Sequence, residues 1–342
     1  MGDRKLAELI LGLETSCDET SASVIADGRK ILSNVISSQV QMHQMYGGVV
    51  PELASRQHLE NVVPVIDEAL KQAGAKFADL TAVGVTYGPG LVGALLVGVA
   101  AAKALAYAIR RPLIGVHHVE AHVFANFLAH SELEPPFIAL VASGGHTSLL
   151  HIRNYDDFTL VGQTRDDAAG EAFDKVARLL GLPYPGGPHV ELLARSGSPD
   201  AIAFPRAFSK GAGYEFSFSG LKSAVINYIH TAEQRRETVN KADVAASFQL
   251  AVVDVLVEKT CNAAMEMGVH QVVLAGGVAA NSFLSHAMEV RCAQLGLSLF
   301  FPPPVLCTDN AAMVGCRAYY KHRAGEYSGL ALNAIPYLVP GR

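Results

Sequence analysis

The sequence lacks both the cysteine pattern of a disulfide-stapled secreted protein and the long apolar run of a membrane protein. Its five cysteines, in 342 residues, are dispersed and form no C-x-x-C pair, which indicates a reducing compartment. The chain begins with too short an apolar run for a signal peptide. The one segment that could pass for a membrane span, residues 88–112, is uncharged only as far as Lys103, short of the ~20 residues that a bilayer requires. We therefore expect a cytoplasmic protein without membrane contact, in which residues 88–112 form a buried helix packed on a sheet.

The chain also has fewer positive than negative side chains. Charged residues make up 17% of the chain and the net charge is −5. Such a chain has no general attraction for nucleic acid, because phosphate contacts need Lys or Arg. Its basic runs, RQH and QRRETVNK, are short. If RNA is a partner, a local basic patch or another subunit must supply the phosphate contacts.

Strand-like apolar runs alternate with helical patterns along the whole chain, which indicates an α/β protein. Two distant segments resemble each other: residues 8–28 and residues 136–154 each predict a β-hairpin whose tip carries Gly, Ser and Thr. Each hairpin opens roughly a domain's length of α/β pattern. This repetition predicts a duplicated architecture with a ligand cleft between the halves. We expect domains at residues 1–133 and 134–342, with the last helix free to pack back on the first domain.

Residues 242–284 hold a third informative segment. Residues 242–268 predict a long helix, and HQVVLAGGVAANSFL then predicts a buried strand, the turn Gly276–Gly277 and a helix that begins near Asn281. A strand, a double glycine and a helix start can hold the base or phosphate of a nucleotide against backbone. A plain tight turn between strand and helix is the other interpretation, and the glycines alone do not separate the two.

The stretch HHVEAH places His118 and His122 four residues apart, on one helix face, where both imidazoles can share a cation. A metalloprotease of the H-E-x-x-H type needs its Glu directly after the first His. Here Glu120 is displaced by one residue, about 100° round the helix, so the geometry disfavours a protease. The best remote third ligand is Asp309, at a loop-to-helix junction. Alternatively, Asp309 is an ordinary N-cap and the histidines are packing residues.

The turn ETSCDET carries three carboxylates, Glu14, Asp18 and Glu19, among hydroxyl side chains. Carboxylates in such a turn can coordinate Mg²⁺ or take a proton from a nucleophile, and they can also be plain solvated turn residues. Cys17 has no base beside it in the sequence, so we interpret it as a small packed thiol.

Eight motifs together carry a family resemblance. They are LGLETSCDETSASV, YGGVVPELASRQH, HHVEAH, LVASGGHTSL, GEAFDKVARLLGLPYPGGP, FSFSGLKSAV, LAGGVAANSFL and CTDNAAMVG. In this order, and over nearly the whole chain, they resemble the bacterial type of the universal tRNA N6-adenosine threonylcarbamoyltransferase family. The resemblance implies the actin-like (ASKHA) fold with two duplicated α/β domains. It also implies transfer of threonylcarbamoyl from threonylcarbamoyl-AMP to N6 of the adenosine 3′ of the anticodon, in tRNAs that read codons starting with A, with release of AMP.

The same resemblance assigns roles to residues. It implies that His118, His122 and Asp309 hold one divalent metal ion, iron(II) or zinc, and that Mg²⁺ can accompany a bound nucleotide. The implied contacts to phosphate, ribose and adenosine are Val141, Ala142, Ser143, Gly144, Gly145, Asp174, Gly187 and Asn281. Glu191 stands where some relatives have Asp, which leaves that contact open.

We also expect the transfer reaction to need a catalytic base and partner proteins. An exocyclic adenine amine is a poor nucleophile, so we predict Asp18 or Glu19 as the base. The resemblance implies two partners, a paralogous, catalytically silent ASKHA subunit (TsaB type) and a small ATPase (TsaE type). Two other functions stay open. An ASKHA-type small-molecule kinase shares the hairpins and the Gly–Gly turn but has no need of two histidines, and a non-catalytic nucleotide-gated scaffold would bind partners without turnover.

Overall fold

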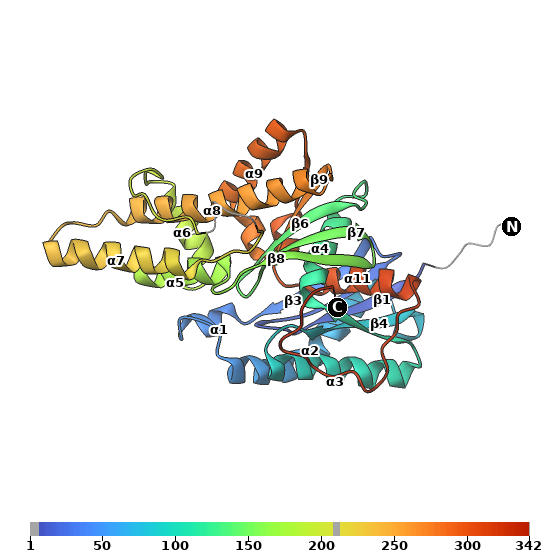
Figure 1. The fold of residues 1–342 in the computed structure, drawn as a ribbon. Coiled ribbons are helices and arrows are strands. Elements are labelled where there is room, and N and C mark those ends of the chain that lie inside the picture. The colour runs from blue at the N-terminus through green and yellow to red at the C-terminus, as the bar shows by residue number, and fades with distance from the viewer. Residues whose placement is uncertain (1–6, 208–212, 342) are drawn as a thin grey trace. The chain divides into compact units, whose positions relative to one another are not determined.

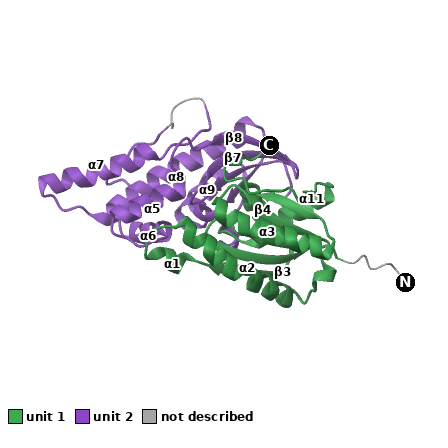
Figure 2. Ribbon diagram, turned by 90° about the horizontal axis from the view of Figure 1, so that it is seen from below, with its two compact units in different colours: residues 1–133, 308–342 green, residues 134–307 purple. Residues whose placement is uncertain are grey.

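The computed structural model describes residues 7–207 and 213–341, so residues 1–6 of the N-terminal stretch lie outside it. The chain forms two compact units: residues 1–133 with 308–342, and residues 134–307 (Figure 2). Each unit contains one five-stranded sheet with helices packed on it (Figure 1).

The first unit is built from eleven elements, one of which comes from the C-terminal end of the chain. They are β1 (Leu9–Glu14), β2 (Glu19–Ala26), β3 (Lys30–Ser38), α1 (Val40–Gln44), α2 (Pro51–Ala73), η1 (Phe77–Asp79), β4 (Ala82–Gly88), α3 (Val92–Ile109), β5 (Leu113–His117), α4 (His118–Ala129) and α11 (Ala311–Arg323).

The second unit contains twelve elements in the part of the chain that the structure describes. They are β6 (Phe137–Ala142), β7 (Thr147–Asn154), β8 (Asp157–Gln163), α5 (Ala169–Leu179), α6 (Gly186–Ala194), α7 (Ser219–Arg235), α8 (Lys241–Glu266), β9 (Gln271–Ala275), η2 (Gly277–Ala280), α9 (Ser282–Leu295), β10 (Ser298–Phe300) and α10 (Pro304–Cys307).

The two sheets have the same topology. Their strand orders are β3-β2-β1-β4-β5 and β8-β7-β6-β9-β10. In each, the first three strands in sequence form an antiparallel meander, and the last two run parallel to the first. Both predicted hairpins are therefore confirmed as β1–β2 and β6–β7, and so is the predicted duplication.

Residues in β1 alternate between the two faces of the first sheet, as strand geometry requires. Leu11 and Leu13 join the apolar core on the side of α2 and α3. Gly12 faces α11 on the other side, where a Cβ would lie 2.4 Å from the carbonyl oxygen of Ala311. Figure 1 shows α2 and α3 below this sheet and α11 above it. The absent side chain thus lets the backbone of α11 approach the strand directly.

Helix α3 differs from the buried helix that the sequence predicts. It is the one helix, among the described residues, that is long and apolar enough to cross a membrane, with 39% of the residues in that window buried. One face packs on β4 and α2, whereas Val92, Leu96 and Tyr107 are exposed. A core helix of a globular protein passes the same composition test. The prediction of burial is right for one face and wrong for the other, because residue composition does not tell how many sides of an apolar helix are covered.

Candidate active site

Three parallel strands of the first unit bring polar side chains to a common edge. Strands β1 and β5 both run parallel to β4, so their carboxyl ends meet. There β1 ends at Glu14, β4 carries Thr86, and β5 ends at His117 and continues directly into α4. The carboxyl edge of parallel strands is the usual position of ligand sites in α/β folds. All three of these side chains are buried.

His117 starts the helix that carries the other two histidines. Its Nδ1 accepts a hydrogen bond from the backbone N–H of Val119 at 3.1 Å, which makes His117 the N-cap of α4. Its Nε2 lies 3.2 Å from the carbonyl oxygen of Leu338 near the C-terminus. Burial lowers the pKa of His117 to about 4, so the ring is neutral and its Nδ1 can accept. His117 is a structural cap, for which no sequence rule gave a signal.

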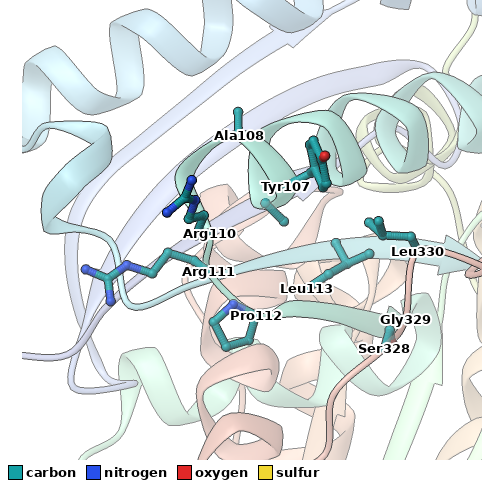
Figure 3. A pocket seen from close by; sticks show the side chains of 10 residues that line it. Tyr107, Ala108, Arg110, Arg111, Pro112, Leu113, Ser328, Gly329 and Leu330 are labelled. Atoms are coloured by element: carbon teal, nitrogen blue, oxygen red, sulfur yellow. The ribbon is translucent and has the colours of Figure 1, made fainter.

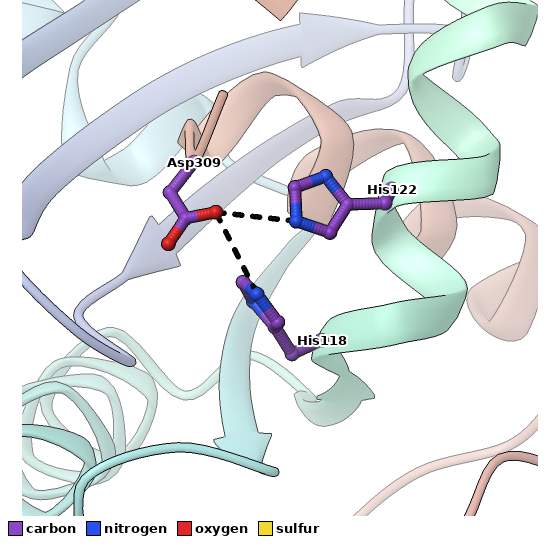
Figure 4. A group of neighbouring side chains, drawn as sticks. All are labelled: His118, His122 and Asp309. Carbon is purple, nitrogen blue, oxygen red and sulfur yellow. Dashed lines mark ion pairs between the residues drawn. The ribbon is translucent and has the colours of Figure 1, made fainter. Parts of the chain in front are cut away.

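His118 and His122 converge on Asp309, as Figure 4 shows. The Nε2 atoms of His118 and His122 lie 3.6 and 3.2 Å from the same Asp309 carboxylate oxygen. One potential ligand atom from each of the three residues lies within 4.8 Å of the others. Both histidines are buried and Asp309 is partly exposed. The structure thus brings together the three residues that the sequence proposed, although Asp309 is separated from the two histidines by more than half of the chain.

The chemistry of His122 fits a metal ion at this point. The side chain is 1% exposed, and neither ring nitrogen makes a hydrogen bond with any described residue. Nε2 does lie 3.2 Å from Asp309, but without hydrogen-bonding geometry, so the proximity is an ion-pair contact only. A buried imidazole whose nitrogens make no hydrogen bond costs free energy, whereas two imidazoles and a carboxylate form a donor set that suits iron(II) or zinc.

Glu14 orients His118 through the ring nitrogen Nδ1, which faces away from Asp309. Its Oε2 lies 3.1 Å from His118 Nδ1 and accepts a hydrogen bond from the Thr86 hydroxyl at 2.7 Å. Its other oxygen accepts the backbone N–H of Ser16 at 2.5 Å. A carboxylate at Nδ1 holds the proton on that nitrogen and leaves Nε2 free to bind a metal. The sequence singled out Glu14 as a turn carboxylate but did not predict this contact.

The buried charges around His118 shift its pKa and that of Glu14. Burial alone would lower the pKa of His118, but the carboxylates of Asp309 and Glu14 outweigh burial and raise it to about 9. Burial would raise the pKa of Glu14, and the positive charge and hydrogen bond of His118 overcome this and lower it. The cluster therefore attracts positive charge into a buried site, which a divalent cation would satisfy.

The two predicted bases, Asp18 and Glu19, lie in different surroundings of the same loop. Asp18 is buried, and the side chain of Glu19 at the start of β2 accepts a hydrogen bond from the Ser38 hydroxyl at 3.1 Å. Burial, reinforced by the charges of Asp18 and Asp309, raises the pKa of Glu19 to about 10. Glu19 is thus protonated at neutral pH and suited to donate a hydrogen bond. Burial likewise raises the pKa of Cys17, in agreement with a packed, unreactive thiol.

His58 of α2 holds this loop from the side. Its Nε2 lies 2.9 Å from the carbonyl oxygen of Cys17 and its Nδ1 lies 2.7 Å from the Thr20 hydroxyl. His58 is fully buried. Its motif, YGGVVPELASRQH, contributed to the family resemblance, but nothing in its spacing predicted a contact with the loop of Asp18 and Glu19.

In the second unit, the carboxyl ends of β6 and β9 repeat the arrangement of the first. The loop Ser143–Gly145 follows β6, and Gly276 follows β9, which runs parallel to it. Gly144 and Gly145 are exposed, and a Cβ on either would meet open space. The loop also lies against the start of α5, where the Gly170 N–H donates to the carbonyl oxygen of Ser143 at 3.2 Å. Exposed loop amides next to a helix N-terminus form an environment that favours an anion.

Gly276 is required by geometry. Its φ is +85°, and a Cβ would lie 2.4 Å from the carbonyl oxygen of Ala142 at the end of β6. The predicted helix start near Asn281 is confirmed, because its side chain caps α9 by accepting the Leu284 N–H at 2.9 Å. Its amide nitrogen donates to Gln249 at 3.0 Å. One further lone pair and one N–H of Asn281 are left for a ligand.

The other implied nucleotide residues lie on α5 and α6. Asp174 is half-buried, and its Oδ1 accepts the Gly186 N–H at 2.6 Å, which ties α5 to the start of α6. Gly187 has open space where a Cβ would stand. Glu191 accepts hydrogen bonds from the N–H and hydroxyl of Ser282, so it positions the start of α9. All implied nucleotide contacts belong to the second unit, and the implied metal ligands belong to the first.

A surface pocket of about 530 Å³ lies at the other end of β5 from these ligands (Figure 3). It is lined by the end of α3, by Pro112 and Leu113 at the start of β5, and by residues 328–330. Arg110 and Arg111 border it. Because it stands at the amino end of β5, it is separate from the cluster of His118, His122 and Asp309 at the carboxyl end.

Comparisons with known proteins agree with this geometry. A family model described as TsaD, tRNA N6-adenosine threonylcarbamoyltransferase, matches residues 30–316. Curated relatives of that name include one from Moorella thermoacetica, 59% identical over 96% of this chain and 96% of the relative. Another, from Clostridium kluyveri, is 54% identical over 97% of this chain and 98% of the relative.

Two solved structures are similar in fold. HypF from T. kodakarensis matches with a TM-score of 0.63 and 17% identity over 94% of this chain and 48% of that one. The (R)-2-hydroxyglutaryl-CoA dehydratase component A of Acidaminococcus fermentans matches with a TM-score of 0.56 and 17% identity, over 92% of this chain and 99% of that one. At this identity the likeness concerns the fold alone, and it confirms the predicted actin-like architecture.

Proposed function

The chain belongs to the tRNA N6-adenosine threonylcarbamoyltransferase family, and on this premise we propose the details of its reaction. It is a transferase of tRNA modification. The threonylcarbamoyl group moves from threonylcarbamoyl-AMP to N6 of the adenosine 3′ of the anticodon in tRNAs that read codons starting with A, and AMP leaves. The observation that carries the proposal is the buried cluster of His118, His122 and Asp309, because neither a small-molecule kinase nor a scaffold requires it.

His118, His122 and Asp309 hold one divalent metal ion, iron(II) or zinc. Three protein ligands leave coordination positions open for substrate, as catalytic sites require. When bound, the ion supplies a Lewis acid that polarises the carbonyl of the threonylcarbamoyl group. Glu14 keeps His118 in the tautomer that presents Nε2, and Thr86 keeps the carboxylate of Glu14 in place.

The AMP part of the donor binds to the second unit. The amides of Gly144 and Gly145 face the phosphate, in the loop that follows Val141 and Ala142 at the end of β6. Ser143 shapes this loop, because its N–H already donates to the carbonyl oxygen of His146 at 2.8 Å. The ribose hydroxyls bind Asp174 beside Gly187, and the adenosine lies at Asn281. Exposed loop amides at the start of α5 and the open space at Gly187 support these assignments.

Asp18 is the better candidate for the base that accepts the proton of the attacking amine. Glu19 is held protonated by its buried surroundings and by the neighbouring carboxylates, so it can donate a hydrogen bond but is poorly suited to accept a proton. Asp18 directly precedes Glu19 and is buried, and its carbonyl oxygen accepts the N–H of Gln39 at 2.9 Å. This bond fixes the backbone from which the carboxylate of Asp18 extends.

Partner proteins supply what this acidic chain lacks. We propose that the paralogous subunit (TsaB type) docks on the outer face of α2 and α3, where Leu59, Val63, Val92 and Leu96 are exposed at i, i+4 spacing on each helix. A related fold would present an equivalent helix pair, so the two pairs could form a pseudo-symmetric interface. The small ATPase (TsaE type) and tRNA join this assembly in the cytoplasm.

Replacement of His118 tests the proposal. We expect His118→Ala to lose bound metal and transfer activity together, with AMP release from threonylcarbamoyl-AMP in the presence of tRNA as the readout. The control is His286→Ala, because His286 is exposed on α9 and belongs to neither ligand set. Full transfer by metal-free His118→Ala would exclude the metal role. ATP-dependent phosphorylation of a small metabolite, without AMP release, would favour the kinase instead.

A further inference from the structure

We infer that Glu120 and Arg317 are positioning residues for the metal cluster: their buried ion pair locks α4 to α11 and so fixes His118 and His122 relative to Asp309. This inference rests on the proposed metal site. It gives a role to Glu120, the residue of the HHVEAH stretch that is displaced from the position a metalloprotease would need.

The ion pair is buried and well formed. Glu120 Oε2 and Arg317 Nε lie 3.0 Å apart, with the side chains 10% and 4% exposed. The guanidinium of Arg317 also lies over the ring of Phe124, 5.0 Å from its centroid. Glu120 and Phe124 are four residues apart and therefore lie on one face of α4. On this face the carboxylate of Glu120 pairs with the charge of the guanidinium, and the ring of Phe124 lies under its plane.

That face of α4 is opposite to the ligand face. At about 100° per residue, Glu120 points roughly 180° away from the mean direction of His118 and His122. A contact on this side cannot touch the metal. It can only fix the position of α4 as a whole, and the position of α4 determines the positions of both imidazoles.

Helix α11 carries the third ligand in the same way. Asp309 immediately precedes Asn310, the N-cap of α11, and Arg317 follows two turns later. Aromatic contacts continue the same seam, since Tyr320 lies against Phe124 and Phe127 with ring centroids 5.3 and 5.8 Å apart. The two helices that pack along this seam therefore carry or adjoin all three ligands.

The ion pair is needed to fix the two helices, because apolar packing alone lets one helix shift slightly along the other. A guanidinium fixed by both a carboxylate and a ring defines the register of α4 on α11. Asp309 Oδ1 lies 3.6 Å from one imidazole and 3.2 Å from the other, so a slide of one helix would change these separations directly. Metal ligands tolerate only a few tenths of an ångström of error.

The test measures metal affinity, not activity. The full chain is stripped of metal, and its Kd for Zn²⁺ is determined by competition with a chromophoric chelator. Arg317→Met and Glu120→Gln should each raise the Kd at least about 10-fold, the effect typical of residues that support ligands from outside the coordination sphere. Arg317→Lys keeps the charge without the planar fork and should recover part of the affinity.

A control that destabilises another part of the first unit separates positioning from stability. Val65→Ala removes buried volume from α2, away from α4 and α11, and should lower the melting temperature of the metal-free chain while leaving the Kd for Zn²⁺ unchanged. Arg206→Met breaks an ion pair of the second unit and should also leave the Kd unchanged.

Three outcomes can be told apart. A raised Kd in the Arg317 and Glu120 variants, with both controls unchanged, supports the inference. An unchanged Kd in Arg317→Met and Arg317→Lys overturns it while the metal site stands, and so does a Kd raised equally in Val65→Ala. Failure of the unsubstituted chain to bind Zn²⁺ or iron(II) overturns the proposed metal site and the inference with it.

Discussion

At the scale of single residues, the candidate site depends on side chains that contact the proposed ligands from outside the His118, His122 and Asp309 set. Glu14 is fully buried, and its carboxylate bonds to His118, Thr86 and Ser16. The three partners come from separate segments: His118 and Thr86 lie at Oε2, and the N–H of Ser16 bonds to Oε1. The function of this carboxylate is therefore to hold one imidazole nitrogen, and a residue with a different charge should fail even if it fits the space.

We expect Glu14→Gln to weaken metal binding about 10- to 100-fold, because an amide cannot stabilise the proton on Nδ1 of His118 as a carboxylate does. The measurement is the Kd for Zn²⁺ of the metal-free chain. Thr86→Val should show a smaller effect in the same direction, since it removes only the hydroxyl that bonds Glu14. A Glu14→Gln variant that binds Zn²⁺ like the unsubstituted chain would refute this role.

Asp166 of the second unit has a pH-dependent structural role. Burial would raise its pKa, but hydrogen bonds from the hydroxyls of Ser217 and Ser219 and from the backbone N–H groups of Phe218 and Ser219 outweigh this and lower it to about 2. Since the folded-state pKa lies below the unfolded value of 3.8, the stabilisation is fully present above pH 4 or so and is lost as pH falls toward 2. The carboxylate caps the start of α7.

Asp166→Ala should therefore lower the melting temperature at pH 7, and the difference from the unsubstituted chain should shrink between about pH 4 and pH 2. Thermal denaturation of both proteins across that range measures this. A difference that stays constant over the whole range would show that the charge of Asp166 contributes nothing.

At the scale of elements, α11 joins the sheet of the first unit through close backbone contact. Gly12 of β1 and Gly315 of α11 face each other, and a Cβ on Gly12 would lie 2.6 Å from the Gly315 nitrogen. Gly84 of β4 faces the same helix. A Cβ added to Gly84 would lie 2.5 Å from the Cβ of Ala318. Because Asp309 lies just before α11, this contact also sets the height of the carboxylate above the sheet.

Gly12→Ala should cost about 1–3 kcal/mol of unfolding free energy by overpacking, and it should weaken Zn²⁺ binding as α11 shifts. Chemical denaturation and the Zn²⁺ titration report the two effects. Gly220→Ala is the matched control, because Gly220 lies in the first turn of α7 with open space around it and should change neither quantity adversely. Equal behaviour of the two variants would contradict the close contact.

Much of the element pattern could be predicted from the sequence. Hairpins β1–β2 and β6–β7 follow from apolar alternation around Gly/Ser/Thr turns, and α8 follows from helical spacing that ends before Gly268. Those signals are local. The contacts of Glu14 with Thr86 and of Glu120 with Arg317 join positions 72 and 197 residues apart, and they depend on how strands pair and helices pack. No local pattern encodes that. The resemblance pointed to the candidate ligands, whereas the residues that support them could not be predicted from the sequence.

At the scale of the whole molecule, charge limits what the chain does alone. With a net charge of −5, it should bind tRNA weakly and with a shallow salt dependence, since few phosphates are neutralised. The paralogous subunit should steepen the salt dependence and strengthen binding.

Val63→Glu on the exposed face of α2 should abolish that gain without changing the melting temperature of the chain alone. Gel filtration and tRNA titration at several salt concentrations test both expectations, and an unimpaired complex with Val63→Glu would rule out this docking face.

The most direct test of the proposed function follows the product itself. The chain is incubated with threonylcarbamoyl-AMP, an unmodified tRNA that reads a codon starting with A, and both partner subunits. The nucleosides are then analysed by mass spectrometry. We expect N6-threonylcarbamoyladenosine to appear 3′ of the anticodon in step with AMP, and neither product with His118→Ala. AMP release with no modified nucleoside, or unmodified tRNA at every partner ratio, would contradict the assignment.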